Sequence, residues 1–196
     1  MKDKESQKTK TVLITGCSRG IGAATTEKFL SAGWYVIGTS TSGNSAIKHD
    51  SLSMVKLDLG SETSIEQCVA LLEKQNITLD VLINNAGVNP GIDDEYLSVE
   101  KLRQTIEVNL IGLISLTEKV FPLLLPKGRV INLTSSAGNV NNQYIQQSLT
   151  PYGIAKAGVN LYTHNLAKRF KDKGLIVLAL HPGWVRTDMG SPDAPK

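Results

Sequence analysis

The 196-residue sequence is poor in cysteine and in long apolar runs, and each shortage excludes a class of protein. Two cysteines, Cys17 and Cys68, are too few for a disulfide framework, and neither has the spacing of a metal ligand. No apolar run approaches the ~20 residues of a membrane span, and none precedes the first expected strand as a signal peptide would. We therefore expect a reduced compartment, the cytoplasm, with no metal site and no membrane partner.

The sequence also lacks a strong excess of charge of one sign. Its net charge is +3, and the Lys-rich residues 1–9 supply much of it. We expect 1–9 to be a frayed tail and 10–196 to form one domain. A nucleic-acid-binding protein usually combines a basic stripe with aromatic residues, but the two tryptophans, five tyrosines and three phenylalanines here are scattered. No nucleic-acid partner is expected.

Short apolar runs alternate with segments of helical periodicity along the chain. The expected strands are 11–15, 34–40, 54–58, 81–84, 129–134 and 175–180, and the expected helices are 20–32, 62–75, 99–121 (one or two helices) and 151–172. This alternation predicts a single α/β domain of the doubly wound Rossmann type, with a parallel sheet of about six strands and helices on both faces. The polar segment 138–150 is expected to be a loop or an insertion.

Three glycines, Gly16, Gly20 and Gly22, separate the first strand from the first helix. Glycine lets the backbone turn sharply and approach a pyrophosphate, and the helix N-terminus offers N–H groups to the anion. The spacing of these glycines is Gly-x-x-x-Gly-x-Gly. The alternative to a dinucleotide site is a tight strand-to-helix turn without a ligand. The residues predicted to bind a dinucleotide in this loop are Gly16, Ser18, Arg19, Gly20, Ile21 and Gly22.

The end of the second strand indicates which dinucleotide is bound. An NAD site usually has an acidic residue there for the ribose 2′-hydroxyl, but this sequence has Ser40 and Thr41. Arg19 could bind a 2′-phosphate with its guanidinium. The expected cofactor is therefore NADP, with NAD as the alternative if Arg19 is only a solvated loop charge.

Tyr152 and Lys156 lie four residues apart and would share one face of a helix. An ammonium beside a phenol favours the phenolate and lowers the phenol pKa. The pair is therefore a candidate for proton exchange near neutral pH. The alternative is an ordinary aromatic residue at a helix start, packed on the sheet.

Six motifs in a fixed order extend this pattern over nearly the whole chain: TGCSRGIG from Thr15, NNAG at 84–87, EVNLIG around Asn109, INLTSSAG at 131–138, the Tyr152–Lys156 motif and HPGWVRTDM at 181–189. In these motifs the sequence resembles the classical short-chain dehydrogenase/reductase family. The residues in these motifs are most similar to those of the branch of sniffer-type and C-factor-type carbonyl reductases. The resemblance implies reversible hydride transfer between a nicotinamide and a carbonyl or alcohol.

The resemblance also implies roles for individual residues. Tyr152 would be the general acid or base, Lys156 would hold the nicotinamide ribose, Ser135 (with Ser136 as the alternative) would hold the substrate oxygen, and Asn109 would carry a water. The further cofactor contacts that it implies are Ser40, Asp58, Leu59, Asn85, Ala86, Gly87, Tyr152, Lys156, Pro182, Gly183, Val185 and Thr187.

The sequence departs from the family pattern in two places. It ends soon after Met189, so we expect the sheet to lack its C-terminal strand. The separation from Ser135 to Tyr152 is longer than usual, and Tyr144 and Ile145 in the extra loop are either substrate contacts or loop anchors. The resemblance favours a homo-oligomer and a small-molecule carbonyl or alcohol substrate. A dinucleotide-binding regulatory protein with little turnover is the alternative function.

Overall fold

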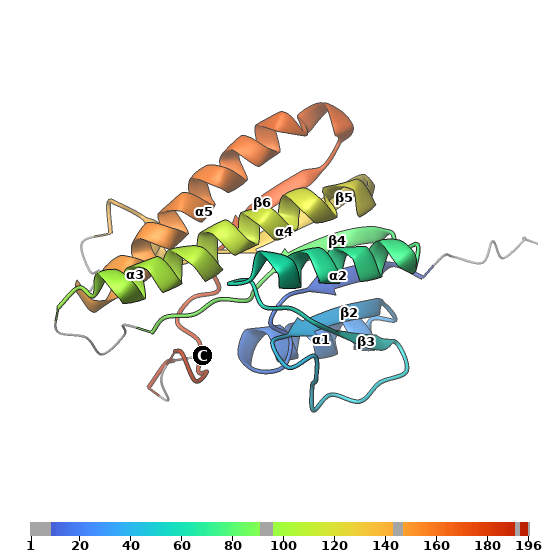
Figure 1. Ribbon diagram of the computed structural model, residues 1–196, viewed down its shortest axis with the longest axis horizontal. Coiled ribbons are helices and arrows are strands. Elements are labelled where there is room, and N and C mark those ends of the chain that lie inside the picture. Colours follow the sequence, from blue (N-terminus) through green and yellow to red (C-terminus); the bar gives the residue numbers. More distant parts are fainter. Residues whose placement is uncertain (1–8, 91–95, 143–146, 191–192, 196) are drawn as a thin grey trace, which may run out of the picture.

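The computed structural model describes residues 9–90, 96–142, 147–190 and 193–195, and its centre is a six-stranded parallel sheet (Figure 1). The strands are β1 (Thr11–Ile14), β2 (Tyr35–Ser40), β3 (Leu52–Lys56), β4 (Leu79–Asn84), β5 (Leu124–Leu133) and β6 (Ile176–Leu180). Their order is β3-β2-β1-β4-β5-β6, with every neighbouring pair parallel. The order reverses between β1 and β4, and in such sheets a crevice forms outside the carboxyl ends of those strands. The predicted doubly wound fold is confirmed.

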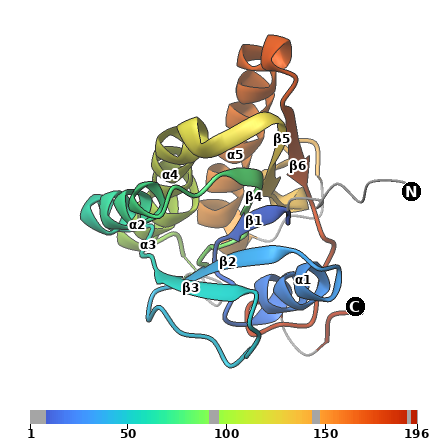
Figure 2. The ribbon, with the colours of Figure 1, turned by 90° about the vertical axis from the view of Figure 1, so that its right-hand side faces the viewer.

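The helices cover both faces of this sheet. They are α1 (Gly20–Ser31), α2 (Glu62–Lys74), α3 (Val99–Ile106), α4 (Leu113–Val120) and α5 (Thr150–Arg169), with a π-helical segment at Glu107–Gly112 and 3₁₀ turns at Phe121–Leu123, Ser136–Gly138, Gln147–Leu149 and Lys171–Lys173. Figure 2 shows α1 on one face and α2, α4 and α5 on the other. Within the described ranges no helix combines the length and the apolar character that a membrane crossing requires.

The strand expected at 54–58 lies at Leu52–Lys56 and the one expected at 81–84 begins at Leu79, and two further elements differ in kind or by a larger margin. The helical pattern at 99–121 is interrupted by the π-helical segment, where Gly112 packs so closely that a Cβ atom would overlap the Leu59 carbonyl oxygen. Strand β5 begins at Leu124 rather than at residue 129, because Leu124 pairs with Leu79 before the register shifts. Lys127 has a φ of 64° within that irregular stretch. Neither feature has a periodicity that sequence patterns detect.

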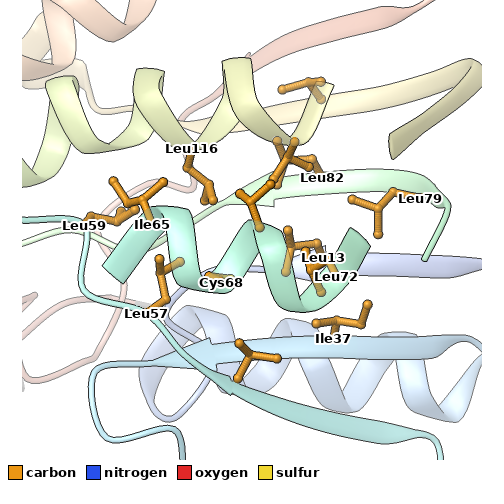
Figure 3. Close-up of a cluster of buried hydrophobic side chains, with 14 of the residues drawn as sticks. Leu13, Ile37, Leu57, Leu59, Ile65, Cys68, Leu72, Leu79, Leu82 and Leu116 are labelled. Carbon is orange, nitrogen blue, oxygen red and sulfur yellow. The ribbon is translucent and has the colours of Figure 1, made fainter. Parts of the chain in front are cut away.

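The hydrophobic core lies on both sides of the sheet. Leu13 of β1 packs with residues of α2 and α4, among them Leu72 and Leu116 (Figure 3), whereas its neighbours Val12 and Ile14 pack on the α1 side. Because each central strand is buried on both faces, its sequence is a continuous apolar run rather than an alternating one.

Strand β6 is one of the two edge strands of the described sheet, the other being β3. Its alternate residues Ile176, Leu178 and Leu180 are 44%, 46% and 43% exposed, whereas Val177 packs against the core. Helix α1 packs against β1 and β2, so it does not reach β6. The described helices therefore leave the β6 end of that face open.

Helix α2 offers a matched pair of leucines for testing this core. Leu72 is fully buried, and its neighbour Leu71 is exposed. Leu72→Ala should lower the free energy of unfolding by about 2–5 kcal/mol, because it leaves a cavity between α2 and the sheet. Leu71→Ala should cost less than about 1 kcal/mol. Denaturant unfolding of both variants measures the difference, and equal costs would contradict the packing described here.

Candidate active site

A cavity of about 400 Å³ lies where the carboxyl ends of the strands meet. It brings together sixteen of the residues predicted from the sequence, namely Gly16, Ser18, Arg19, Gly20, Ile21, Gly22, Ser40, Asp58, Leu59, Asn85, Ala86, Gly87, Tyr152, Lys156, Pro182 and Thr187. Four predicted residues within the described ranges do not line it: Asn109, Ser135, Gly183 and Val185. Tyr144 and Ile145 lie outside the described residues, as do residues 1–8 of the predicted tail.

The sequence reading missed several lining residues, which are Thr39, Leu57, Val88, Gln104, Val108, Leu133, Thr134, Asp188 and Met189. Thr39, Leu133 and Thr134 lie at or next to strand ends, where the rule for parallel sheets would have pointed to them. Gln104 and Val108 come from α3 and the π-helical segment. Their helical spacing alone gives no reason to place them at the cavity.

The glycine loop is held against the end of β4 by backbone and amide contacts. Gly16 has a φ of 67°, and a Cβ there would lie 2.9 Å from the Ala86 Cα. The Asn85 side-chain amide donates to the carbonyl oxygens of Thr15 and Gly16, at 2.8 and 3.0 Å. A Cβ on Gly22 would overlap the Gly16 carbonyl oxygen. The loop therefore accepts only glycine at these two positions.

The first turn of α1 has features that favour the binding of an anion. Its N-cap residue, Arg19, makes no capping hydrogen bond with its side chain, and the first turn contains no acidic residue. In contrast, α2 and α3 are each capped by a serine hydroxyl and have a glutamate in the first turn. The uncapped N–H groups and the helix dipole of α1 favour a negatively charged ligand.

The side chains expected to recognise the adenosine end lie at the cavity but already have partners. Arg19 Nη1 lies 3.1 Å from Asp188 Oδ2 in an exposed ion pair. The Ser40 hydroxyl donates to the Asn44 carbonyl at 2.9 Å and accepts from its N–H at 3.0 Å. The exposed Asp58 carboxylate accepts from the Gly60 N–H at 2.9 Å.

Tyr152 and Lys156 lie on α5 at the same cavity. Lys156 is only 3% exposed, and its Nζ donates to the Leu133 carbonyl at 2.6 Å and lies 5.4 Å from the Tyr152 ring centroid. Burial lowers the pKa of Lys156 to about 8. Burial also raises the pKa of Tyr152, so the expectation that the ammonium lowers the phenol pKa is wrong for this structure. The cause of the raised Tyr152 pKa is burial of the phenol, while the Lys156 ammonium donates to the Leu133 carbonyl.

Asn109 and Ser135 are both held by neighbouring backbone. The buried Asn109 amide donates to the Val88 carbonyl at 2.7 Å and accepts from the Val88 N–H at 2.8 Å. The Ser135 hydroxyl accepts from the Ala137 N–H at 3.1 Å. Ser135 is half-buried, whereas the alternative, Ser136, is exposed. The Asn109 side chain therefore has its orientation fixed by Val88, while the Ser135 hydroxyl can still donate its hydrogen.

A buried polar network below the cavity fixes α5 to the sheet. The Asn84 amide donates to Asn132 Oδ1 and to Thr117 Oγ1, both at 2.8 Å, and the Asn132 amide donates to Thr163 Oγ1 at 2.9 Å. The four side chains link α4, β4, β5 and α5, so they set the position of the helix that carries Tyr152 and Lys156.

Comparison with known proteins relates this chain to a known family. The model of the family described as short chain dehydrogenase matches residues 10–196. The chain is 32% identical over 182 residues to a 3-amino-tetrahydro-pyrrolizinone reductase from Xenorhabdus hominickii, an alignment that covers 91% of this chain. The chain spans 62% of the length of that relative and 35% of the length of a second curated relative that it matches.

Two solved structures show the same fold. The NADPH-bound carbonyl reductase from chicken fatty liver aligns with a TM-score of 0.84 and 26% identity, over 93% of this chain and 79% of that one. The carbonyl reductase Sniffer of D. melanogaster aligns with a TM-score of 0.82 over 95% of this chain and 86% of its own, and at 24% identity it supports the fold alone. Because the family model covers the chain from the start of β1 onward, this chain belongs to the short-chain dehydrogenase family.

Proposed function

We propose that this chain binds NADP and carries out reversible hydride transfer between the nicotinamide and a carbonyl or alcohol, with Tyr152 as the proton donor or acceptor. The observation that carries the proposal is that one cavity is lined both by the glycine loop and by Tyr152 and Lys156. A dinucleotide bound at the loop and a side chain that could exchange a proton would therefore share the same space.

The glycine loop fits the pyrophosphate of a dinucleotide. Gly16 and Gly22 leave room that a side chain would fill, and the first turn of α1 offers uncapped N–H groups. Asp58 would face the adenine, and Arg19 would bind the 2′-phosphate that distinguishes NADP from NAD. The chicken carbonyl reductase, which shares this fold, binds NADPH and supports the choice.

The raised pKa of Tyr152 suits proton donation. A bound nicotinamide would supply the hydride for reduction, and the substrate oxygen would then need a proton for its developing negative charge. Burial keeps the phenol protonated at neutral pH, so its proton is available to that oxygen. An alkoxide is more basic than a phenolate, so the transfer is favourable. In the oxidative direction the same oxygen returns its proton to Tyr152.

Lys156 would serve both the cofactor and the phenolate. One of its three N–H groups donates to the Leu133 carbonyl, and the others would bind the ribose hydroxyls. Its charge would stabilise the phenolate that forms when Tyr152 gives up its proton. The Ser135 hydroxyl would donate to the substrate oxygen and stabilise the charge there. Asn109 would bind a relay water through the N–H or the lone pair that its two hydrogen bonds with Val88 leave available.

Tyr152→Phe tests the proton transfer. The variant should lose turnover of a carbonyl substrate by at least about 100-fold, since general acid catalysis contributes about 10²–10⁴-fold. Its affinity for NADPH, measured by fluorescence titration, should stay unchanged, because Phe retains the ring and loses only the hydroxyl.

Tyr162→Phe is the matched control for this test. Tyr162 lies on the same helix, but its hydroxyl donates to Glu118 at 2.8 Å on the exposed side, so this variant should keep full turnover. If wild-type protein binds NADPH, shows no turnover with a panel of carbonyls, and Tyr152→Phe changes nothing, the chain is a dinucleotide-binding regulatory protein instead.

The buried Lys156 ammonium predicts a pH-dependent stability. Its folded-state pKa of about 8 lies below the value of 10.5 for an unhindered lysine. Between pH 8 and pH 10 the unfolded chain therefore binds more protons than the folded chain, and the free energy of unfolding should rise with pH. Relative to Lys156→Met, the wild type should gain on the order of 2 kcal/mol between pH 7 and pH 10.

Denaturant unfolding at several pH values measures this gain. Lys156→Met leaves the Leu133 carbonyl without its ammonium donor, which lowers the free energy of unfolding by the same amount at every pH. This constant loss cancels when the changes in the free energy of unfolding with pH are compared. Lys168→Met, which alters an exposed lysine of the same helix, should parallel the wild type. Parallel curves for wild type and Lys156→Met would show that the ammonium is not penalised by burial.

A further inference from the structure

The segment that follows β6 packs onto the glycine loop. Residues 184–190 form a closed turn, here called the C-terminal turn, in which the Gly190 N–H donates to the Thr187 carbonyl and hydroxyl oxygens, both at 3.0 Å. The Trp184 indole donates to the Gly190 carbonyl. A Cβ atom on Gly20 would lie 3.2 Å from the Thr187 Cγ2. The C-terminal turn and the glycine loop are therefore in direct contact at the cavity.

An ion pair joins these two segments. The Arg19 and Asp188 side chains are 80% and 77% exposed, and a single contact of 3.1 Å joins Nη1 to Oδ2. Both residues line the cavity. An exposed pair with one such contact contributes little to stability, so another anion can displace the carboxylate. A phosphate carries more charge than a carboxylate and accepts two guanidinium N–H groups at once.

We infer that Asp188 is a specificity-determining residue that competes with the 2′-phosphate of NADP for Arg19. This inference rests on the proposed function. Asp188 occupies the Nη1 edge of the guanidinium, so a 2′-phosphate that binds through this edge would have to displace the carboxylate. NAD has no 2′-phosphate and makes no demand on Arg19. Asp188 therefore reduces the preference for NADP over NAD without affecting NAD itself.

A double-mutant cycle on the whole chain tests this competition. The dissociation constants for NADPH and NADH are measured by fluorescence titration for wild type, Asp188→Asn, Arg19→Gln and the double variant. Asp188→Asn should bind NADPH roughly two- to fivefold more tightly, which is the range of an exposed ion pair, and its affinity for NADH should not change. In the Arg19→Gln background, Asp188→Asn should change neither affinity.

Asp172→Asn is the control for net charge. Asp172 lies in the 3₁₀ turn that precedes β6, at the opposite end of that strand from the C-terminal turn. Its substitution changes the net charge by the same amount as Asp188→Asn, so it should leave both dissociation constants unchanged. Thermal melts by circular dichroism should show that all variants fold, since the substituted side chains are exposed.

Several results would overturn the inference while leaving the proposed function intact. They are unchanged or weaker NADPH binding in Asp188→Asn, equal tightening of both cofactors, and a gain that persists in the Arg19→Gln background. Each of these results counts against the inference alone when the wild-type protein binds NADPH and turns over a carbonyl substrate. A folded wild type that binds neither dinucleotide would overturn both the inference and the proposed function.

Discussion

The contact between the ends of β1 and β4 is the constraint on which the site depends. The Thr15 hydroxyl oxygen accepts from the Asn85 and Ala86 N–H groups, both at 3.0 Å, while the Asn85 amide donates back to the carbonyls of Thr15 and Gly16. These bonds replace the sheet ladder where the two strands diverge. They satisfy buried polar groups that would otherwise be costly, and they fix the glycine loop at the point where the strand order reverses.

The position of α5 depends on a second set of polar contacts in the core. The network from Thr117 through Asn84 and Asn132 to Thr163 is buried, so each of its hydrogen bonds is expensive to break. Leu133, which follows Asn132 in the chain, provides the carbonyl that accepts from Lys156. The network joins β5 to α5 beside an ammonium that is 3% exposed, and the hydrogen bond from Lys156 to Leu133 offsets part of the cost of its burial. Precise placement of the charge is obtained at the expense of stability.

Much of this architecture is predictable from local sequence, and the exceptions have physical causes. Strands buried on both faces produce continuous apolar runs, and positions such as Gly16 and Gly22 tolerate no side chain, so both features are visible in the sequence. The π-helical turn at Glu107–Gly112 and the early start of β5 arise from tertiary packing and have no local pattern. The partner of Arg19 was also missed, because Asp188 is distant in the sequence and nothing near either residue indicates the pair.

The direction of the shift in the Tyr152 pKa was mispredicted for a similar reason. The error clarifies how Tyr152 and Lys156 would act together in proton transfer. Spacing along a helix places Lys156 near the phenol, but it does not reveal that the ammonium is buried and donates to Leu133, or that the phenol is half-buried. Burial favours the neutral phenol before reaction, when it must still hold its proton. Once that proton leaves, a phenolate lies beside the ammonium in a region of low dielectric, and their attraction becomes strong. In the proposed reaction the lysine would therefore have its greatest effect on the phenolate formed by the proton transfer rather than on the resting phenol.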